Sequence, residues 1–201
     1  MKHQHKRYAG VVGRKPPRYD VPKAAPRPLR LVQQFVNTVD HENAREWLGS
    51  EDELEAWLVE HGLPSTGADA EHARVVREAF RALLVANNDR SDPPPEALCA
   101  LNASAERAPV AIRLDPPGRP VLVGNEWLGA LLAAAFAALL DPRWPRLKAC
   151  RNCGWAFYDE SRNRSARWCS MLLCGNRLKT RDYRARRGAA PARRRRDRTV
   201  T

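Results

Sequence analysis

Four cysteines near the C-terminal end of this chain constrain its fold more than any other feature. Their spacing, Cys150-x2-Cys153-x15-Cys169-x4-Cys174, is close to the paired-cysteine pattern of zinc sites, although x2 is commoner than x4 in the second pair. Zinc suits this pattern because it has no redox chemistry and takes four thiolates in a tetrahedron. We therefore predict one zinc ion held by these four cysteines. Since four protein ligands leave no open coordination position, the ion would hold the fold and would not catalyse.

Two other roles for the cysteines stay open on sequence grounds. A C-x2-C pair can form a redox disulfide, but that motif needs neither a second pair nor arginine-rich surroundings. Four buried free thiols are the second alternative. The fifth thiol, Cys99, lies far from the others in sequence. We expect it to be a buried apolar residue without a metal role.

The residues around the cysteines predict a small finger. Gly154 favours a tight turn after the first pair, in which backbone NH groups can point at the sulfurs. Residues 155–159 alternate as a strand, and residues 166–168 can return as a second strand. Ser170 can cap a following helix that carries Cys174 in its first turns. This combination predicts a treble-clef-like finger, with Trp155 and Trp168 as its small core.

A helical domain is expected before the finger. In its first segment, apolar residues recur at helical spacing at Leu31, Val32, Phe35, Val36 and Val39. Ser50 and Glu53 fit a capping box for a second helix, which Gly62 can end. Similar patterns predict helices around residues 75–84, 96–105 and 126–140. The runs 110–114 and 120–124 flank a turn and predict one β-hairpin.

These patterns predict a mainly α fold with a small β-hairpin (α+β), in which a helical domain precedes the zinc finger. Residues 1–28 are basic and rich in proline, with too few large apolar residues to offset the entropy of ordering. The expected organisation is a disordered basic arm at 1–28, a helical domain at 29–140, a finger at 145–187 and a disordered Arg-rich tail at 188–201. The helical domain has apolar residues for a core of its own, so we expect it to survive loss of the metal.

The charge of the chain is segregated. The formal net charge is +12, yet residues 31–140 hold 8 Lys or Arg against 17 Asp or Glu, whereas residues 141–201 hold 18 against 5. A region of one sign attracts a polyanion, so DNA or RNA is the expected partner class. The apolar run at 128–140 is too short for the roughly 20 residues of a membrane span. Without a signal-peptide pattern at the start, we expect a cytoplasmic, nucleoid-associated protein.

Arginines mark the expected nucleic-acid face. Those of residues 160–168 lie on a turn-rich segment, and three more fall at i, i+4 and i+7 of the predicted last helix. The expected contact residues are Arg162, Arg164, Arg167, Arg177, Lys179, Arg181 and Arg184. Arg177 has an alternative role, since it could bond Asp159 or Glu160 across the finger, and Asn176 is expected to be structural. The tail at 193–196 is expected to touch phosphates only.

The run WCSMLLCGNR, at residues 168–177, resembles the CGNR zinc-finger family of bacterial proteins. The segments LRLVQQFVNTVD and SEDELEAWLVEHGL resemble the ABATE domain that accompanies this finger. The resemblance covers residues 29–187 and implies a DNA-binding transcription regulator, induced by stress in some members. The long basic arm and the RRRR tail depart from that pattern.

A DNA-binding regulator is therefore the leading hypothesis for function. In it the finger contacts duplex DNA, and the helical domain forms a homodimer or senses a small-molecule effector. An RNA- or ribosome-associated zinc protein is the alternative, because such fingers and arginine tails serve RNA equally well. A third class is an adaptor whose basic finger meets an acidic protein. No catalytic set is recognisable in the sequence, so we do not expect an enzyme.

Overall fold

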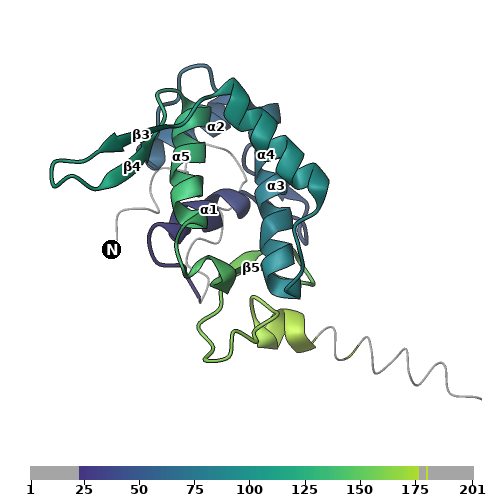
Figure 1. Ribbon diagram of the computed structural model, residues 1–201. Helices are drawn as coiled ribbons and strands as arrows, with labels where there is room; N and C mark the ends of the chain where they lie inside the picture. The colour runs from purple at the N-terminus through teal and green to yellow at the C-terminus, as the bar shows by residue number, and fades with distance from the viewer. Residues whose placement is uncertain (1–22, 177–179, 181–201) are drawn as a thin grey trace, which may run out of the picture.

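The computed structural model describes residues 23–176 and residue 180 (Figure 1). Within this part, five α-helices are accompanied by three pairs of short antiparallel strands, which is the predicted α+β class. The helices are α1 (Leu29–Val36), α2 (Glu51–Glu60), α3 (Ala70–Asp89), α4 (Pro95–Arg107) and α5 (Trp127–Leu139). None of the described helices is long and apolar enough to pass through a bilayer.

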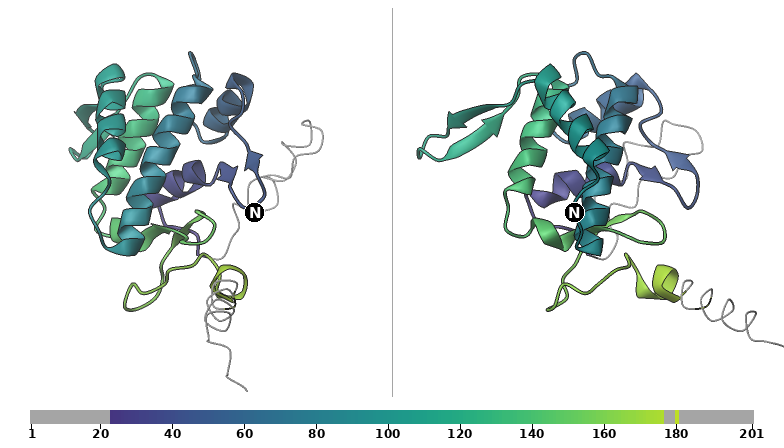
Figure 2. Two further views of the ribbon diagram at one scale, coloured as in Figure 1. Left: turned by 90° about the vertical axis from the view of Figure 1, so that its right-hand side faces the viewer. Right: turned by 45° about the vertical axis from the view of Figure 1, so that its right-hand side comes forward.

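The long helix α3 organises the helical body. It packs against α1, α2 and α4, and α5 packs against α1 and α4 (Figure 2). One face of α3 is buried because apolar residues recur every three or four positions, at Ala73, Val76, Phe80, Leu83 and Leu84. In α5 the apolar residues cover most of the circumference, and the helix is accordingly buried against its neighbours.

The reciprocal capping predicted for α2 by Ser50 and Glu53 is present, with the NH of Gly49 as the donor to Glu53. The backbone NH of Glu53 donates to the Ser50 hydroxyl at 3.3 Å, and the Glu53 carboxylate accepts from the NH of Gly49 at 2.8 Å. Three acidic residues in the first turn also suit the positive end of the helix dipole. The helix ends at Glu60, and Gly62 takes a left-handed φ of 70° beyond it. This start and end confirm the boundaries that the sequence indicates.

Three strand pairs complete the fold. Their members are β1 (Val39–Asp40) with β2 (Arg45–Glu46), β3 (Ala111–Leu114) with β4 (Pro120–Val123), and β5 (Leu147–Ala149) with β6 (Ala156–Tyr158). The β3–β4 pair is the predicted hairpin, and it extends from the helical body at the end opposite the finger (Figure 1). Val39 was expected on the first helix, but it pairs with Glu46 in β1, because α1 ends at Val36 with Asn37 as its C-cap.

The finger strands share the main hydrophobic core. Leu147, Ala149 and Ala156 are buried in the same cluster as the helices, and β5 packs along α3. The inner side of the finger hairpin therefore packs into the core of the helical body, so the two parts do not have wholly separate cores.

The described residues begin at residue 23, six residues before the expected start of the helical domain at residue 29. Ala25 is buried, and its NH donates to the Gln33 side chain at 2.7 Å. The Lys23 carbonyl accepts from the NH of Tyr158 at 2.8 Å, at the outer side of β6. Residues 23–28 thus pack across the base of the finger, and the rest of the expected basic arm lies outside the described residues.

Candidate metal centre and basic finger face

The sulfur atoms of Cys150, Cys153, Cys169 and Cys174 form one compact cluster. All four lie within 4.8 Å of one another, and the three distances among Cys153, Cys169 and Cys174 are 3.6 to 3.7 Å. Tetrahedral zinc with Zn–S bonds of about 2.3 Å places sulfurs about 3.8 Å apart, whereas a disulfide needs about 2.05 Å. The spacing therefore fits four ligands around one zinc ion and excludes the redox disulfide in this arrangement.

The first cysteine pair forms the turn between β5 and β6. The NH of Cys150 donates to the Trp155 carbonyl and the NH of Gly154 donates to the Cys150 carbonyl, both at 2.9 Å. Gly154 has a φ of 71°, which a residue with a side chain adopts at a cost. The tight turn expected at this glycine is confirmed.

The pairing of the finger strands differs from the expectation. Residues 156–158 pair with residues 147–149 before the first cysteine, and residues 166–168 form no strand. The cysteine turn itself joins the two strands, so the hairpin lies around the metal site and not after it. The sequence did not reveal β5 because the strand has only three residues and its middle one is a lysine, a residue type that is rarely buried.

The second cysteine pair lies at the start of the last described helical segment, η4 (Met171–Gly175). Cys169 precedes it and Cys174 lies inside it, as expected. The NH groups of Cys174 and Gly175 donate to the Ser170 carbonyl at 3.0 and 3.1 Å. Asn152 adds a contact that the sequence did not reveal, because its side-chain amide donates to the Cys174 sulfur at 3.6 Å.

The pKa values of the clustered thiols explain why this site favours a cation. Hydrogen bonds from Cys153 and Cys169 lower the pKa of the Cys150 thiol, whereas the hydrogen bond to Cys150 raises the pKa of Cys153 to about 12. Hydrogen bonds with Cys150 and Cys153 raise the pKa of Cys169. Four sulfurs this close cannot all ionise by themselves, and a divalent cation replaces their protons.

Aromatic side chains form the small core of the finger, as predicted. Trp155 and Phe157 are buried with three of the cysteines, and Trp168 packs against them. The ammonium group of Lys23 lies 5.1 Å from the centre of the Phe157 ring and donates to the Trp168 carbonyl at 3.1 Å. The two tryptophans are therefore committed to packing.

Polar side chains of α1 and α3 hold the backbone of the finger. Asn37 exchanges two hydrogen bonds with the Ala156 backbone, at 2.7 and 2.9 Å. Asn88 donates to the Ala149 and Arg167 carbonyls at 2.7 and 3.1 Å. Arg81 donates to the Gly154 carbonyl inside the cysteine turn. These contacts orient the metal centre relative to the helical body.

A buried ion pair braces the arginine-rich loop at residues 159–167. Lys148 and Asp159 are 2% and 0% exposed and lie 2.7 Å apart, and Lys148 also donates to the Arg164 and Ala166 carbonyls. The Asp159 carboxylate accepts from the NH groups of Ser161 and Ala166. Burial raises the pKa of Asp159, but the hydrogen bonds from Lys148 and Ser161 outweigh it and lower that pKa. Asp159 therefore already has a buried partner other than Arg177.

The expected nucleic-acid residues divide into two groups. Arg162, Arg164 and Arg167 are exposed on the braced loop. The remaining four, Arg177, Lys179, Arg181 and Arg184, lie outside the described residues, as does the tail at 193–196. Asn176 is exposed, and its carbonyl accepts from the Thr180 hydroxyl at 2.9 Å.

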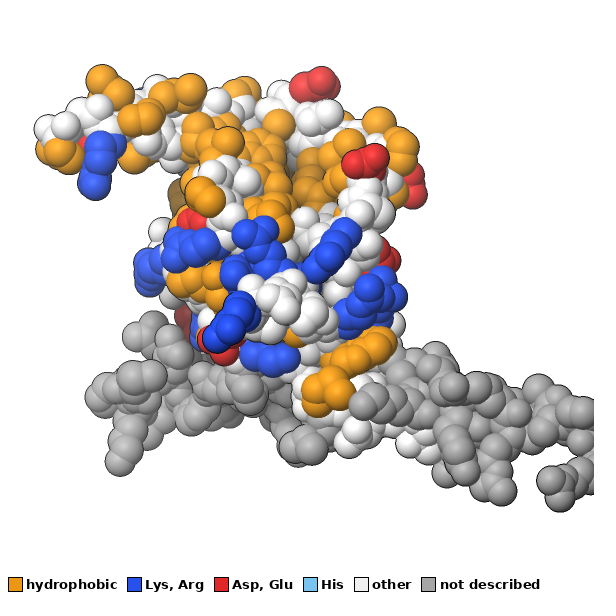
Figure 3. Space-filling model, turned by 60° about the horizontal axis from the view of Figure 1, so that its bottom comes forward, with side chains coloured by type: hydrophobic (Ala, Val, Ile, Leu, Met, Phe, Trp, Pro, Cys, Tyr) orange, Lys and Arg blue, Asp and Glu red, His pale blue; other side chains and the backbone are white. Residues whose placement is uncertain are grey.

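Lysine and arginine side chains gather on the face of the molecule that includes the finger (Figure 3). Besides the loop arginines, exposed arginines in this region of the fold include Arg90, Arg143 and Arg151. Sequence analysis did not single these out, because only the fold brings Arg151 to the C-terminal end of α3, where it pairs with Asp89. The C-terminal end of α3 brings Arg90 to the finger loop, where it donates to the Asn163 and Arg164 carbonyls.

Cys99 is not buried as expected. It lies on α4, within the helical body, but is exposed. The buried face of α4 contains Ala97, Leu101 and Ser104, and Cys99 points away from it because two residues span about 200° of a helix. It also stands apart from the cysteine cluster.

Two family models match the chain. The ABATE model, described as "Putative stress-induced transcription regulator", matches residues 29–141, and the model described as "CGNR zinc finger" matches residues 146–187. A search of curated proteins gives no match. The first model alone covers more than half of the 201 residues, and the second contains the cysteine cluster. The chain therefore belongs to the ABATE family of transcription regulators and contains, at residues 146–187, a CGNR zinc finger that can bind one zinc ion.

Proposed function

We propose that this protein is a regulator that binds duplex DNA through its zinc finger, and that it is not an enzyme. The observation that carries the proposal is the arrangement of Arg162, Arg164 and Arg167 on a loop braced by a buried ion pair beside the metal centre. Arginine pairs bidentately with phosphate and with guanine edges. A fixed loop presents these groups with less loss of entropy than a flexible one.

Binding to duplex DNA, structured RNA and single strands at one salt concentration tests this proposal. Replacing Arg164 and Arg167 by Gln should weaken duplex binding and lower the preference among sequences, since a bidentate base contact is worth about 1 to 3 kcal/mol. Arg113→Gln, on the hairpin at the far end of the molecule, is the matched control. A pool of genomic fragments would reveal a preferred site.

Deleting residues 193–196 provides a second comparison. If the tail touches phosphates only, its loss should weaken binding to all duplexes alike. Each lost phosphate contact should reduce the slope of log K against log salt by about 0.9. Tighter binding to structured RNA at equal salt would favour the RNA-associated alternative. If the protein binds neither DNA nor RNA, the result would favour the third hypothesis, in which the finger binds an acidic protein.

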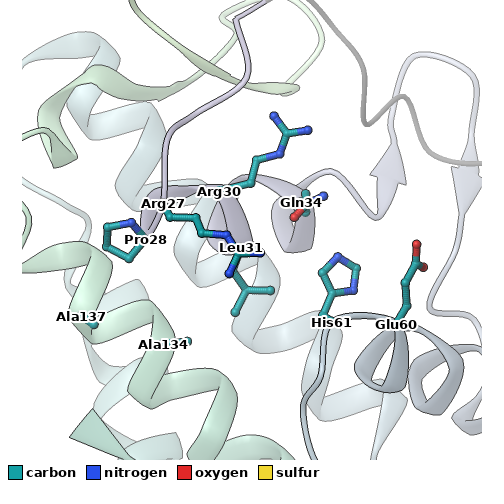
Figure 4. Close-up of a pocket in the computed structure, with 9 residues that line it drawn as sticks. All are labelled: Arg27, Pro28, Arg30, Leu31, Gln34, Glu60, His61, Ala134 and Ala137. Carbon is teal, nitrogen blue, oxygen red and sulfur yellow. The ribbon is translucent and has the colours of Figure 1, made fainter. Parts of the chain in front are cut away.

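A cavity of about 500 Å³ in the helical body supports the sensing role (Figure 4). Its lining joins the start of α1 to α2 and α5. The polar and apolar groups of the lining are Arg27, Arg30, Gln34, Glu60, His61, Leu31 and Ala134. The volume is within the usual range of small-molecule sites, and two arginines against one glutamate favour a ligand with an acidic group. A screen of small acids for a shift in melting temperature, with Arg27→Ala as comparison, tests this role.

The β3–β4 hairpin supports dimerisation through the helical domain. Ile112 and Leu114 are each 71% exposed, and within the described residues β3 pairs only with β4. A second copy could add to this free edge and cover both side chains. Sedimentation of the protein and of an Ile112→Lys variant tests the role, since the variant should sediment as a monomer.

A further inference from the structure

A cavity of about 420 Å³ lies where the helical body meets the finger loop. Six polar residues and a proline line it, and none of these lining residues is acidic. The six are Asn87, Arg90, Lys148, Arg162, Asn163 and Arg164. We call this cavity the junction notch. The charge of Lys148 is balanced by Asp159, so three guanidinium groups give the notch its positive character.

Arg90 connects the two sides of the notch. It is the C-cap of α3, and its Nη2 lies 3.3 and 3.4 Å from the Asn163 and Arg164 carbonyls. A guanidinium has five NH donors, and both contacts involve Nη2 alone. The group can therefore hold the finger loop and still donate to an anion in the notch.

The backbone at two of these arginines is in an unfavourable conformation. Arg90 has a φ of 57° and Arg164 a φ of 51°, both in the left-handed region. Helices that end in this conformation usually do so at glycine or asparagine, which adopt it at lower cost. Two arginines at such positions on one cavity indicate that their side chains are used there.

We propose that the junction notch binds a phosphate of the DNA backbone and that Arg90 is a contact residue for it. The inference rests on the proposed duplex binding and extends the interface from the finger to the helical body. Arg90 and Arg162 approach the notch from its two sides, and a phosphate is the anion that a bound duplex offers at regular intervals. Bound DNA would then contact both domains at once.

The variant Arg90→Asn tests this inference. Asparagine adopts the left-handed conformation readily, so the end of α3 should be kept while the charge is lost. We expect the slope of log K against log salt to fall by about 0.9, equally for specific and unrelated duplexes. Zinc content should be unchanged. The melting temperature should change little, because the relieved backbone strain at the end of α3 offsets the loss of two long, exposed hydrogen bonds. Arg113→Asn, on the distant hairpin, should leave the slope unchanged.

A second variant and a competitor make the test decisive. Arg162→Asn should give the same loss of slope from the finger side, even if Arg90→Asn did not fold. If the wild type binds duplex DNA and both variants keep its slope, the notch is not a contact site although the proposed function stands. If the wild type does not bind duplex DNA, both proposals fail. Inorganic phosphate that binds the wild type but neither variant, and that displaces no DNA at equal ionic strength, would indicate a free-anion site and overturn the inference.

Discussion

The guanidinium of Arg81, on α3, donates a hydrogen bond to the carbonyl of Gly154, inside the cysteine turn. The same side chain donates to the Val36 carbonyl at the end of α1 at 2.6 Å and is only 7% exposed. One buried arginine thus joins two helices to the metal centre. Zinc binding and the stability of the helical body are therefore expected to depend on each other.

Removal of zinc should destabilise the helices as well as the finger. Without metal the cysteine turn loses its constraint, and each buried donor that loses its acceptor costs about 1 to 3 kcal/mol. At about 2 to 4 °C per kcal/mol, the melting temperature should fall by several degrees. Thermal melts followed by circular dichroism, with and without a chelator, measure this. Helices that melt at the same temperature in both would support the independence expected from sequence.

Replacing single cysteines should separate ligands from the fifth thiol. Cys169→Ser should lose most of the bound zinc, because sulfur is the preferred ligand and the site has no spare one. Cys99→Ala should keep one zinc per chain, since Cys99 is exposed on α4 away from the cluster. Elemental analysis of both variants gives the result. Full zinc in the first, or loss of zinc in the second, would show the ligand set to be wrong.

Asn152 should tune zinc affinity without being a ligand. Its amide donates to the Cys174 sulfur at 3.6 Å, and outer contacts of this kind change metal affinity by about 10- to 100-fold. Competition with a chromogenic chelator should show weaker binding by Asn152→Ala at unchanged stoichiometry. Asn102→Ala, at an exposed position on α4, is the control. Equal affinities in the two variants would assign Asn152 no role at the metal.

Removing the Lys148 charge should be strongly destabilising. Lys148→Met leaves the Asp159 carboxylate buried without its ion-pair partner, and breaking such a pair costs about 3 to 5 kcal/mol. Urea denaturation should show this loss, whereas Arg113→Met at an exposed position should change stability little. A loss below 1 kcal/mol would mean that the pair does not brace the loop.

Stability should fall in acid because of Glu46. Burial raises its pKa, but hydrogen bonds from Arg77 and from the NH groups of Leu48 and Trp47 outweigh this and lower it below the ordinary 4.5. The native state therefore binds this proton less readily than the unfolded state. The stabilisation is complete above pH 4.5 and is lost as the pH falls through the lowered value. Glu46→Gln should flatten this part of the curve of unfolding free energy against pH.

Local signals predicted most of the helical body. The capping box at Ser50, the apolar period of α3 and the turn between residues 114 and 120 are each encoded by neighbours in sequence. The four cysteine ligands were also accessible, because their spacing alone fits one tetrahedral ion. These features need no knowledge of distant contacts.

The features that sequence analysis missed depend on partners far along the chain. Lys148 occupies a buried strand only because Asp159 and two carbonyls receive its ammonium group. Asn37 ends α1 while its side chain binds Ala156, 119 residues away. The wrong prediction for Cys99 has a local reason. A free thiol is most often buried, but helical spacing places Cys99 on the face of α4 opposite Ala97 and Leu101.

The contact of Lys23 with the finger also constrains the order in which the protein assembles. Its ammonium group binds the Trp168 carbonyl across 145 residues of sequence, and its carbonyl binds the NH of Tyr158. During synthesis this segment leaves the ribosome well before its partner Trp168, which lies 145 residues further along the chain. The helices can form their local contacts while translation continues. The segment at residues 23–28 docks only after the cysteine hairpin has emerged, so it is made before the helices but reaches its final place after them.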